Sequence, residues 1–208
     1  MLSEGRAGHG GAGQGRAGRR GGGDQDHREA GQDGADDPVA AARQICLRLL
    51  AAAPRTRAEL ANALGRRGVP GEAAGAVLGR FADVGLIDDA AFARAWVESR
   101  HHGRGLARQA LAAELRRRGV DAEDVRTAIE ALSPGDELAT ARRLVAQRAA
   151  SSRGRPLPAR VRQLMGILAR KGYPAGLAYR VVREVLEQER PADGLAEIDE
   201  MADAAVEE

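Results

Sequence analysis

Apolar residues in the central part of the chain recur at steps of three and four positions, and no stretch alternates apolar and polar residues. Steps of three and four place side chains on one face of an α-helix, whereas strict alternation is typical of a β-strand. In residues 38–52, for example, Ile45, Leu49 and Ala52 fall on one face before Pro54 interrupts the pattern. The pattern therefore predicts an all-α fold.

One helical pattern occurs three times, with the form L-x-x-x-L-x-[RK]-[RK]-G-[VY], at residues 60–69, 111–120 and 164–173. The two leucines of each copy lie on the same helix face. The glycine is suited to the left-handed residue that ends a helix, because a Cβ atom is penalised there. The residue after the glycine is placed to contact the second leucine, as in a Schellman cap.

Each copy of this pattern is preceded by a helical stretch, at roughly 39–52, 89–100 and 136–149, and followed by another. The sequence therefore predicts three tandem three-helix repeats, which span residues 38–87, 88–133 and 134–190. A repeat of about fifty residues buries little apolar surface by itself. We therefore expect the three repeats to pack in series as an elongated array.

The two ends of the chain differ in composition from its centre. Residues 1–37 hold 12 of the 27 glycines and almost no large apolar side chain, whereas residues 191–208 hold seven acidic residues and no basic one. Such segments bury too little apolar surface to offset the entropy lost on ordering. We predict that both ends are disordered tails, of which the acidic one forms at most a loose, fraying helix. The acidic end could compete with an anionic partner for the basic centre, although simple solubilisation is the preferred interpretation.

The centre of the chain is strongly basic. Residues 38–190 hold 27 basic and 16 acidic residues, a net charge of +11, and the 46 residues from Leu138 to Arg183 include 11 basic residues and no acidic one. A solvated protein surface is normally of mixed sign, so this acid-free run favours contact with an anionic partner. An abundance of arginine can also reflect a GC-rich genome, so the composition alone does not decide the function.

Arginine side chains bind phosphate or carboxylate groups through two N–H groups at once, which makes the basic stretches candidate contacts for nucleic acid or another anionic surface. For the stretch that begins at residue 100, a simple solvated face is an equally good interpretation. Because the whole chain has five aromatic residues, contact with nucleic acid would be mainly to its backbone. The candidate residues are Arg100, Arg104, Arg108, Arg116, Arg117, Arg118, Arg153, Arg155, Arg160, Arg162, Arg170 and Lys171.

No pattern of a catalytic, cofactor-binding or metal-binding site stands out. His101 and His102 lack the spacing of a helical zinc site and are interpreted as a polar turn. Asp88 and Asp89 are better explained as a helix cap than as metal ligands, and Cys46 as a small core residue. The sequence therefore predicts a protein that is not an enzyme and needs no cofactor.

The sequence also predicts a cytoplasmic protein. No uncharged apolar run approaches the ~20 residues needed to span a membrane. The N-terminus lacks the apolar stretch of a signal peptide, and a single cysteine is typical of a reducing compartment.

The central repeat carries a specific series of features: an aspartate pair, Phe-Ala, an arginine that closes the helix, a glycine turn and an E-L-x-x-[KR]-G-[IV] element. In this sequence they are Asp88-Asp89, Phe92-Ala93, Arg100, Gly103 to Gly105, and Glu114 to Val120. This series resembles the RecX regulatory proteins of bacteria. The resemblance covers about 40–190, and leaves out the glycine-rich and acidic ends.

The resemblance implies three tandem three-helix repeats in a curved, elongated monomer without enzymatic activity. It also implies binding to the recombinase RecA and to RecA–single-stranded-DNA filaments, along the groove of the filament. Such binding would inhibit strand exchange, ATP hydrolysis and co-protease activity, and so act on homologous recombination, DNA repair and the SOS response. Direct binding to single- or double-stranded DNA is expected to be weak.

A second interpretation is a DNA-binding transcription regulator of the helix-turn-helix type. Residues 56–87 read like the core of a winged-helix domain. Against this interpretation, no alternating strand pair follows as the wing, and three similar repeats fit poorly with one recognition helix per half-site. An enzyme is disfavoured because no catalytic set of residues is present.

Overall fold

The computed structural model describes residues 37–189, which contain nine α-helices and no β-strand. The sequence-based prediction of an all-α tandem fold is confirmed. The predicted disorder of residues 1–36 and 191–208 lies outside the described residues. The helices are α1 (Pro38–Ala52), α2 (Arg57–Gly65), α3 (Gly71–Asp83), α4 (Asp89–Arg104), α5 (Arg108–Arg117), α6 (Ala122–Glu130), α7 (Pro134–Ala150), α8 (Leu157–Arg170) and α9 (Ala175–Glu189).

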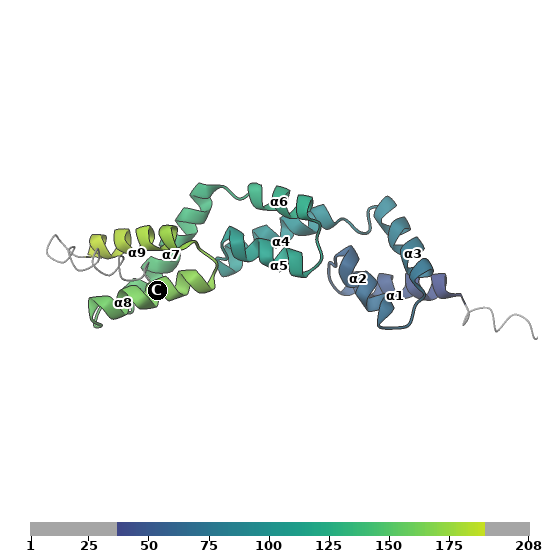
Figure 1. The fold of residues 1–208 in the computed structure, drawn as a ribbon, viewed down its shortest axis with the longest axis horizontal. Helices are drawn as coiled ribbons and strands as arrows, with labels where there is room; N and C mark the ends of the chain where they lie inside the picture. The colour runs from purple at the N-terminus through teal and green to yellow at the C-terminus, as the bar shows by residue number, and fades with distance from the viewer. Residues whose placement is uncertain (1–36, 190–208) are drawn as a thin grey trace, which may run out of the picture. The chain divides into compact units, whose positions relative to one another are not determined.

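The helices form three groups, each with its own hydrophobic core: a first module of α1–α3, a second of α4–α6 and a third of α7–α9. Figure 1 shows the three helices of each module packed together. The leucine pair of the repeated pattern lies at the centre of each core. Its six members are 0% exposed: Leu60, Leu64, Leu111, Leu115, Leu164 and Leu168.

The middle helix of each module ends in the predicted Schellman cap. At the end of α2, the N–H of Val69 donates to the carbonyl of Leu64 at 3.2 Å, and that of Gly68 donates to Gly65 at 3.0 Å. The same two bonds close α5 and α8. The three glycines have φ values of 74°, 76° and 82°, which only glycine adopts without strain. The repeat pattern therefore encodes a helix terminus.

Helix α4 confirms one prediction and corrects another. Asp88 caps its start, because the side chain accepts a hydrogen bond from the N–H of Ala91 at 2.7 Å. The interpretation of His101 and His102 as a polar turn is wrong, since α4 continues to Arg104 and both histidines lie in its last turn. His101 is 1% exposed and is therefore a core residue of the fold.

Successive modules are joined by one recurring contact, in which the start of a middle helix meets the glycine turn of the next module. At the first joint the hydroxyl of Thr56 donates to the carbonyl of Arg118 at 2.7 Å. At the second joint the backbone N–H of Ala107 donates to the carbonyl of Lys171 at 2.9 Å. Thr56 and Ala107 are the N-cap residues of α2 and α5, so the two joints use equivalent positions.

A carboxylate completes each joint. The first N–H of α2, from Arg57, donates to Asp89 at 2.9 Å, and the first N–H of α5, from Arg108, donates to Glu137 at 2.9 Å. Both carboxylates belong to the first helix of the following module. The positive end of each middle helix is thus satisfied by a negative charge from its neighbour.

Among residues 37–189, no helix is both long and apolar enough to cross a membrane.

A cationic hollow at the second joint

The basic residues singled out from the sequence divide into those that hold the fold together and those that are exposed. Arg160 belongs to the first kind, since it is 6% exposed. Its guanidinium donates to the hydroxyl of Ser152 and the carbonyl of Ala149, each at 3.2 Å, and pairs with Glu189. Arg160 therefore joins the α7–α8 turn to the end of α9 and is not available to a partner.

Arg100 and Arg118 lie on the indole ring of Trp96, with guanidinium carbons 4.1 and 3.8 Å from a ring centroid. This distance gives a favourable cation–π contact. Arg118 also forms an ion pair with Glu59 of the first module. Arg118 therefore stabilises the first joint, whereas Arg100 packs on Trp96 within the second module.

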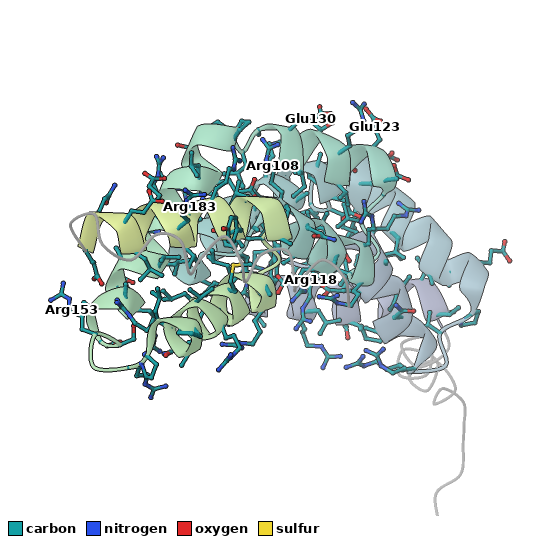
Figure 2. The ribbon with its side chains drawn as sticks, turned by 60° about the vertical axis from the view of Figure 1, so that its left-hand side comes forward. Arg108, Arg118, Glu123, Glu130, Arg153 and Arg183 are labelled. Atoms are coloured by element: carbon teal, nitrogen blue, oxygen red, sulfur yellow. The ribbon has the colours of Figure 1, made fainter. Side chains whose placement is uncertain are left out.

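Arg108 has the same role at the second joint. Besides the contact of its backbone with Glu137, its guanidinium donates to the carbonyl of Leu132. Its Nε atom lies 3.8 Å from a carboxylate oxygen of Glu137. Figure 2 shows Arg108 and Arg118 with the side chains that surround them.

The remaining candidates are more accessible, and Lys171 is half-buried whereas the others are exposed. Arg153 projects outward from the turn between α7 and α8, with a side chain 69% exposed, and contacts Glu189 at 3.4 Å (Figure 2). The accessible residues are Arg104, Arg116, Arg117, Arg153, Arg155, Arg162, Arg170 and Lys171.

Three of these accessible residues line a hollow of about 1050 Å³ at the second joint. Its wall is formed by the end of α4 with the turn after it, by one face of α7, and by the end of α8. Of the residues that the structure describes, five basic ones and no acidic one line the hollow. They are Arg104, Arg143, Arg148, Arg170 and Lys171.

Backbone contacts fix the wall of the hollow. Gly105 ends α4 with a φ of 63°, and a Cβ atom there would lie 2.9 Å from a methyl carbon of Leu144. The hydroxyl of Tyr173 donates to the carbonyl of Gly105 at 3.1 Å, and the ammonium of Lys171 donates to the carbonyl of Arg104. Burial of the hydroxyl, with a smaller effect of nearby Glu137, raises the pKa of Tyr173 to about 12, so it remains a donor at neutral pH.

The buried side chain of His101 also stabilises this wall, because it contacts both the turn after α4 and helix α7. One ring nitrogen lies 2.9 Å from the carbonyl of Leu106, and the other lies 2.9 Å from the hydroxyl of Thr140 on α7. The second module is therefore attached to α7 through a buried side chain. The hollow exists only where the two modules meet.

The electrostatics of the hollow favour an anion with several negative groups. No ion pair formed within residues 37–189 uses any of its five basic side chains. Like charges gathered without a counter-charge raise the local positive potential. Partly buried apolar side chains, those of Leu106, Leu144 and Ile167, also line the hollow. A metal site is not indicated, because no group of three potential ligands occurs in the described part of the chain.

Arg143 and Arg148 were not among the residues singled out from the sequence. Both lie in the acid-free run from Leu138 to Arg183, which was the available signal. Nothing in that run distinguishes the arginines on the joint side of α7 from the others, because the distinction depends on how α7 packs against α4.

The chain is thus an all-α protein of the tandem-repeat class, built from three-helix modules in series. A cationic hollow lies at one joint between modules. Two family models match the chain: "RecX, second three-helix domain" over residues 88–129 and "RecX, first three-helix domain" over residues 42–81. The chain is 61% identical over 165 residues to the regulatory protein RecX of Thermobifida fusca, covering 79% of this chain and 89% of the relative. The chain belongs to the RecX family of regulatory proteins.

Other comparisons agree. The chain is 58% identical over 153 residues to the regulatory protein RecX of Streptomyces coelicolor, covering 74% of this chain and 81% of the relative. The crystal structure of RecX from Lactobacillus salivarius is similar with a TM-score of 0.66 and 16% identity, covering 72% of this chain and 97% of that one. At that identity the structural similarity shows the fold alone.

Proposed function

We propose that the protein binds RecA and RecA–single-stranded-DNA filaments and inhibits their recombinase, ATPase and co-protease activities. The observation that carries the proposal is the cationic hollow, where five basic side chains and no acidic one from the described part of the chain gather. Membership of a family of regulatory proteins supports it. We further propose that the protein acts as a cytoplasmic monomer and catalyses no reaction.

A nucleoprotein filament suits this surface because it presents phosphate groups and acidic protein side chains along one groove. Arginine recognises both kinds of anion with paired hydrogen bonds. Each phosphate that a basic side chain contacts releases a condensed counterion, which makes binding favourable and dependent on salt. Direct binding to free single- or double-stranded DNA is expected to be weak.

The candidate residues take two roles in this proposal. Arg108 and Arg118 stabilise the joints, Arg160 stabilises the third module, and Arg100 packs on Trp96 in the second; none of the four is exposed. The exposed residues contact the filament, together with half-buried Lys171 and with Arg143 and Arg148 of α7. The proposed contact residues are Arg104, Arg116, Arg117, Arg143, Arg148, Arg153, Arg155, Arg162, Arg170 and Lys171.

The test is the DNA-dependent ATPase of RecA, measured with and without the full chain. We expect the hydrolysis rate to fall at less than one molecule of the protein per RecA, and strand exchange to fall with it. An unchanged rate of both reactions at saturating protein would contradict the proposal.

A transcription regulator has less support. A winged helix needs a strand pair, and residues 37–189 contain no β-strand. Retention of one duplex sequence against an excess of unrelated DNA would nevertheless favour that function over the one proposed.

A further inference from the structure

We propose that the acidic segment at residues 191–208 binds in the cationic hollow and competes there with the anionic partner. The competition rests on the proposed function, whereas the binding of the segment to the hollow stands on its own. The segment would then be a built-in regulator of the surface.

Charge complementarity is the first argument. Within residues 37–189, five basic residues and no acidic one line the hollow. Residues 191–208 hold seven acidic residues and no basic one. No ion pair among the described residues neutralises the five basic side chains. The acidic segment supplies the missing counter-charge from the same chain.

The apolar part of the hollow is the second argument. Leu106, Leu144 and Ile167 line it between the basic side chains. The acidic segment carries large apolar residues at steps of three, namely Leu195, Ile198 and Met201. A bare phosphate chain would leave the apolar lining uncovered, whereas a peptide with alternating carboxylates and apolar side chains covers both kinds of surface.

The third argument is that the segment is long enough to reach the hollow from the end of α9. The described chain ends at Glu189, which contacts Arg153 and Arg160 beside the α7–α8 turn. Ser151, two residues before Arg153, already lines the hollow. The 19 residues from 190 to 208 extend to about 60 Å, whereas all of α7 is about 25 Å long. The segment is therefore long enough to enter the hollow.

Tethering makes a weak contact effective. Single exposed ion pairs contribute little and are screened by salt. A segment attached to the same chain, however, has an effective concentration in the range of millimolar. It occupies the hollow when no partner is present and yields to a partner that offers more anionic groups.

The sharpest test uses the single lysine of the chain, Lys171, which lines the hollow. A carbodiimide activates a carboxylate, the lysine amine attacks it, and an amide forms as the activating group leaves as a urea. We expect treatment of the full chain to link Lys171 to a carboxylate of residues 191–208, as located by tandem mass spectrometry. The yield of this crosslink should fall at high salt, and the crosslink should be absent in Lys171→Arg.

A crosslink from Lys171 only to carboxylates outside residues 191–208, or no crosslink at all, would overturn the proposal. The same experiment with a single-stranded oligonucleotide added separates binding of the acidic segment to the hollow from its competition with an anionic partner. Loss of the link on adding the oligonucleotide supports competition for the hollow. A link that persists while the oligonucleotide is bound would overturn the competition. Neither readout depends on RecA, so failure of the proposed function is a distinct result.

A second test measures competition directly. Changing the seven acidic residues of residues 191–208 to their amides should raise the affinity for a fluorescent oligothymidine several-fold at low salt. The matched control changes the seven acidic residues of residues 1–37, which alters net charge by the same amount. Equal effects of the two variants would overturn the proposal, because bulk charge alone would then explain both. The substitutions are Asp193→Asn, Glu197→Gln, Asp199→Asn, Glu200→Gln, Asp203→Asn, Glu207→Gln and Glu208→Gln.

Discussion

Gly68, Gly119 and Gly172 have the same left-handed backbone, but only the last two face a neighbouring module. A Cβ atom on Gly119 would overlap the side chain of Ala58, and one on Gly172 would lie 2.8 Å from the backbone nitrogen of Ala110. Nothing lies within 4 Å of the same position on Gly68. Glycine thus serves the helix end at all three positions and the module joint at two.

This contrast gives a matched pair of substitutions. Gly68→Ala should lower the free energy of unfolding by about 1–2 kcal/mol, the cost of a left-handed backbone with a Cβ atom. Gly119→Ala should lower it by a further ~1–3 kcal/mol, because the added methyl group also overpacks the joint. Urea denaturation of the full chain measures both. Equal losses would show that the close approach at the first joint carries no energetic penalty.

Glu189 is a second residue whose environment has a measurable consequence. Partial burial tends to raise the pKa of its carboxyl group, but the hydrogen bonds and charges of Arg160 and Arg153 outweigh burial and hold that pKa below its usual value. A lowered pKa favours the charged form in the folded protein. The stabilisation is complete above the unfolded pKa of ~4.3 and is lost as the pH falls through the folded value.

The variant Glu189→Gln should therefore be less stable than the wild type at pH 7, because Arg160 loses its buried counter-charge. The difference in melting temperature should shrink as the pH falls below about 4, where the wild-type carboxyl group takes up its proton. Thermal unfolding across a pH series measures this. If the difference in melting temperature stayed constant down to the lowest pH, protonation of Glu189 would have no effect on stability.

At the scale of the helices, the middle helix of a module depends on a carboxylate from the next one. Glu137 of α7 accepts the first N–H of α5 and is 8% exposed. Hydrogen bonds to charged groups contribute about 1.5–3 kcal/mol. The attachment of α5 to the start of α7 at the second joint should depend on this contact.

Glu137→Ala should lower the free energy of unfolding by about 1.5–3 kcal/mol and speed the hydrogen exchange of the Arg108 amide. Glu130→Ala is the control, since the Glu130 side chain is 62% exposed and its one ion pair within residues 37–189 is with Arg126 on its own helix. Its effect should stay within about 0.5 kcal/mol. Unchanged exchange at Arg108 in Glu137→Ala would show that the carboxylate does not protect the start of α5.

The sequence predicts the helices and their caps because both depend on neighbouring residues. The leucine spacing and the glycine at the end of α2, α5 and α8 are local signals, and the structure follows them. The joints depend on contacts between residues far apart in the chain, such as Thr56 with Arg118, so no local sequence pattern predicts them. The buried position of His101 was missed for the same reason, since Thr140 becomes its partner only after folding.

At the scale of the whole described chain, the hollow belongs to no single module. Arg104 comes from the second module, whereas Arg143, Arg148 and Arg170 come from the third. A tandem fold can therefore gather basic side chains from two modules at the joint between them. The basic composition of the sequence favours an anionic partner. Which arginines lie together depends on how the second and third modules pack at their joint.

The most direct measurement compares two triple variants for binding to RecA–single-stranded-DNA filaments as a function of salt. One variant changes Arg143, Arg148 and Arg170 to glutamine. The other changes three exposed arginines of the first module that form no ion pair within residues 37–189, so that both lose the same charge. These are Arg43, Arg48 and Arg80.

If the hollow contacts phosphate, its variant should lose affinity, and the slope of log affinity against log salt should fall in magnitude by about 2, at ~0.7 for each contact with a single strand. The first-module variant should keep the wild-type slope. Identical slopes for the wild type and both variants would contradict the account, because the arginines gathered at the second joint would then not be where the filament binds.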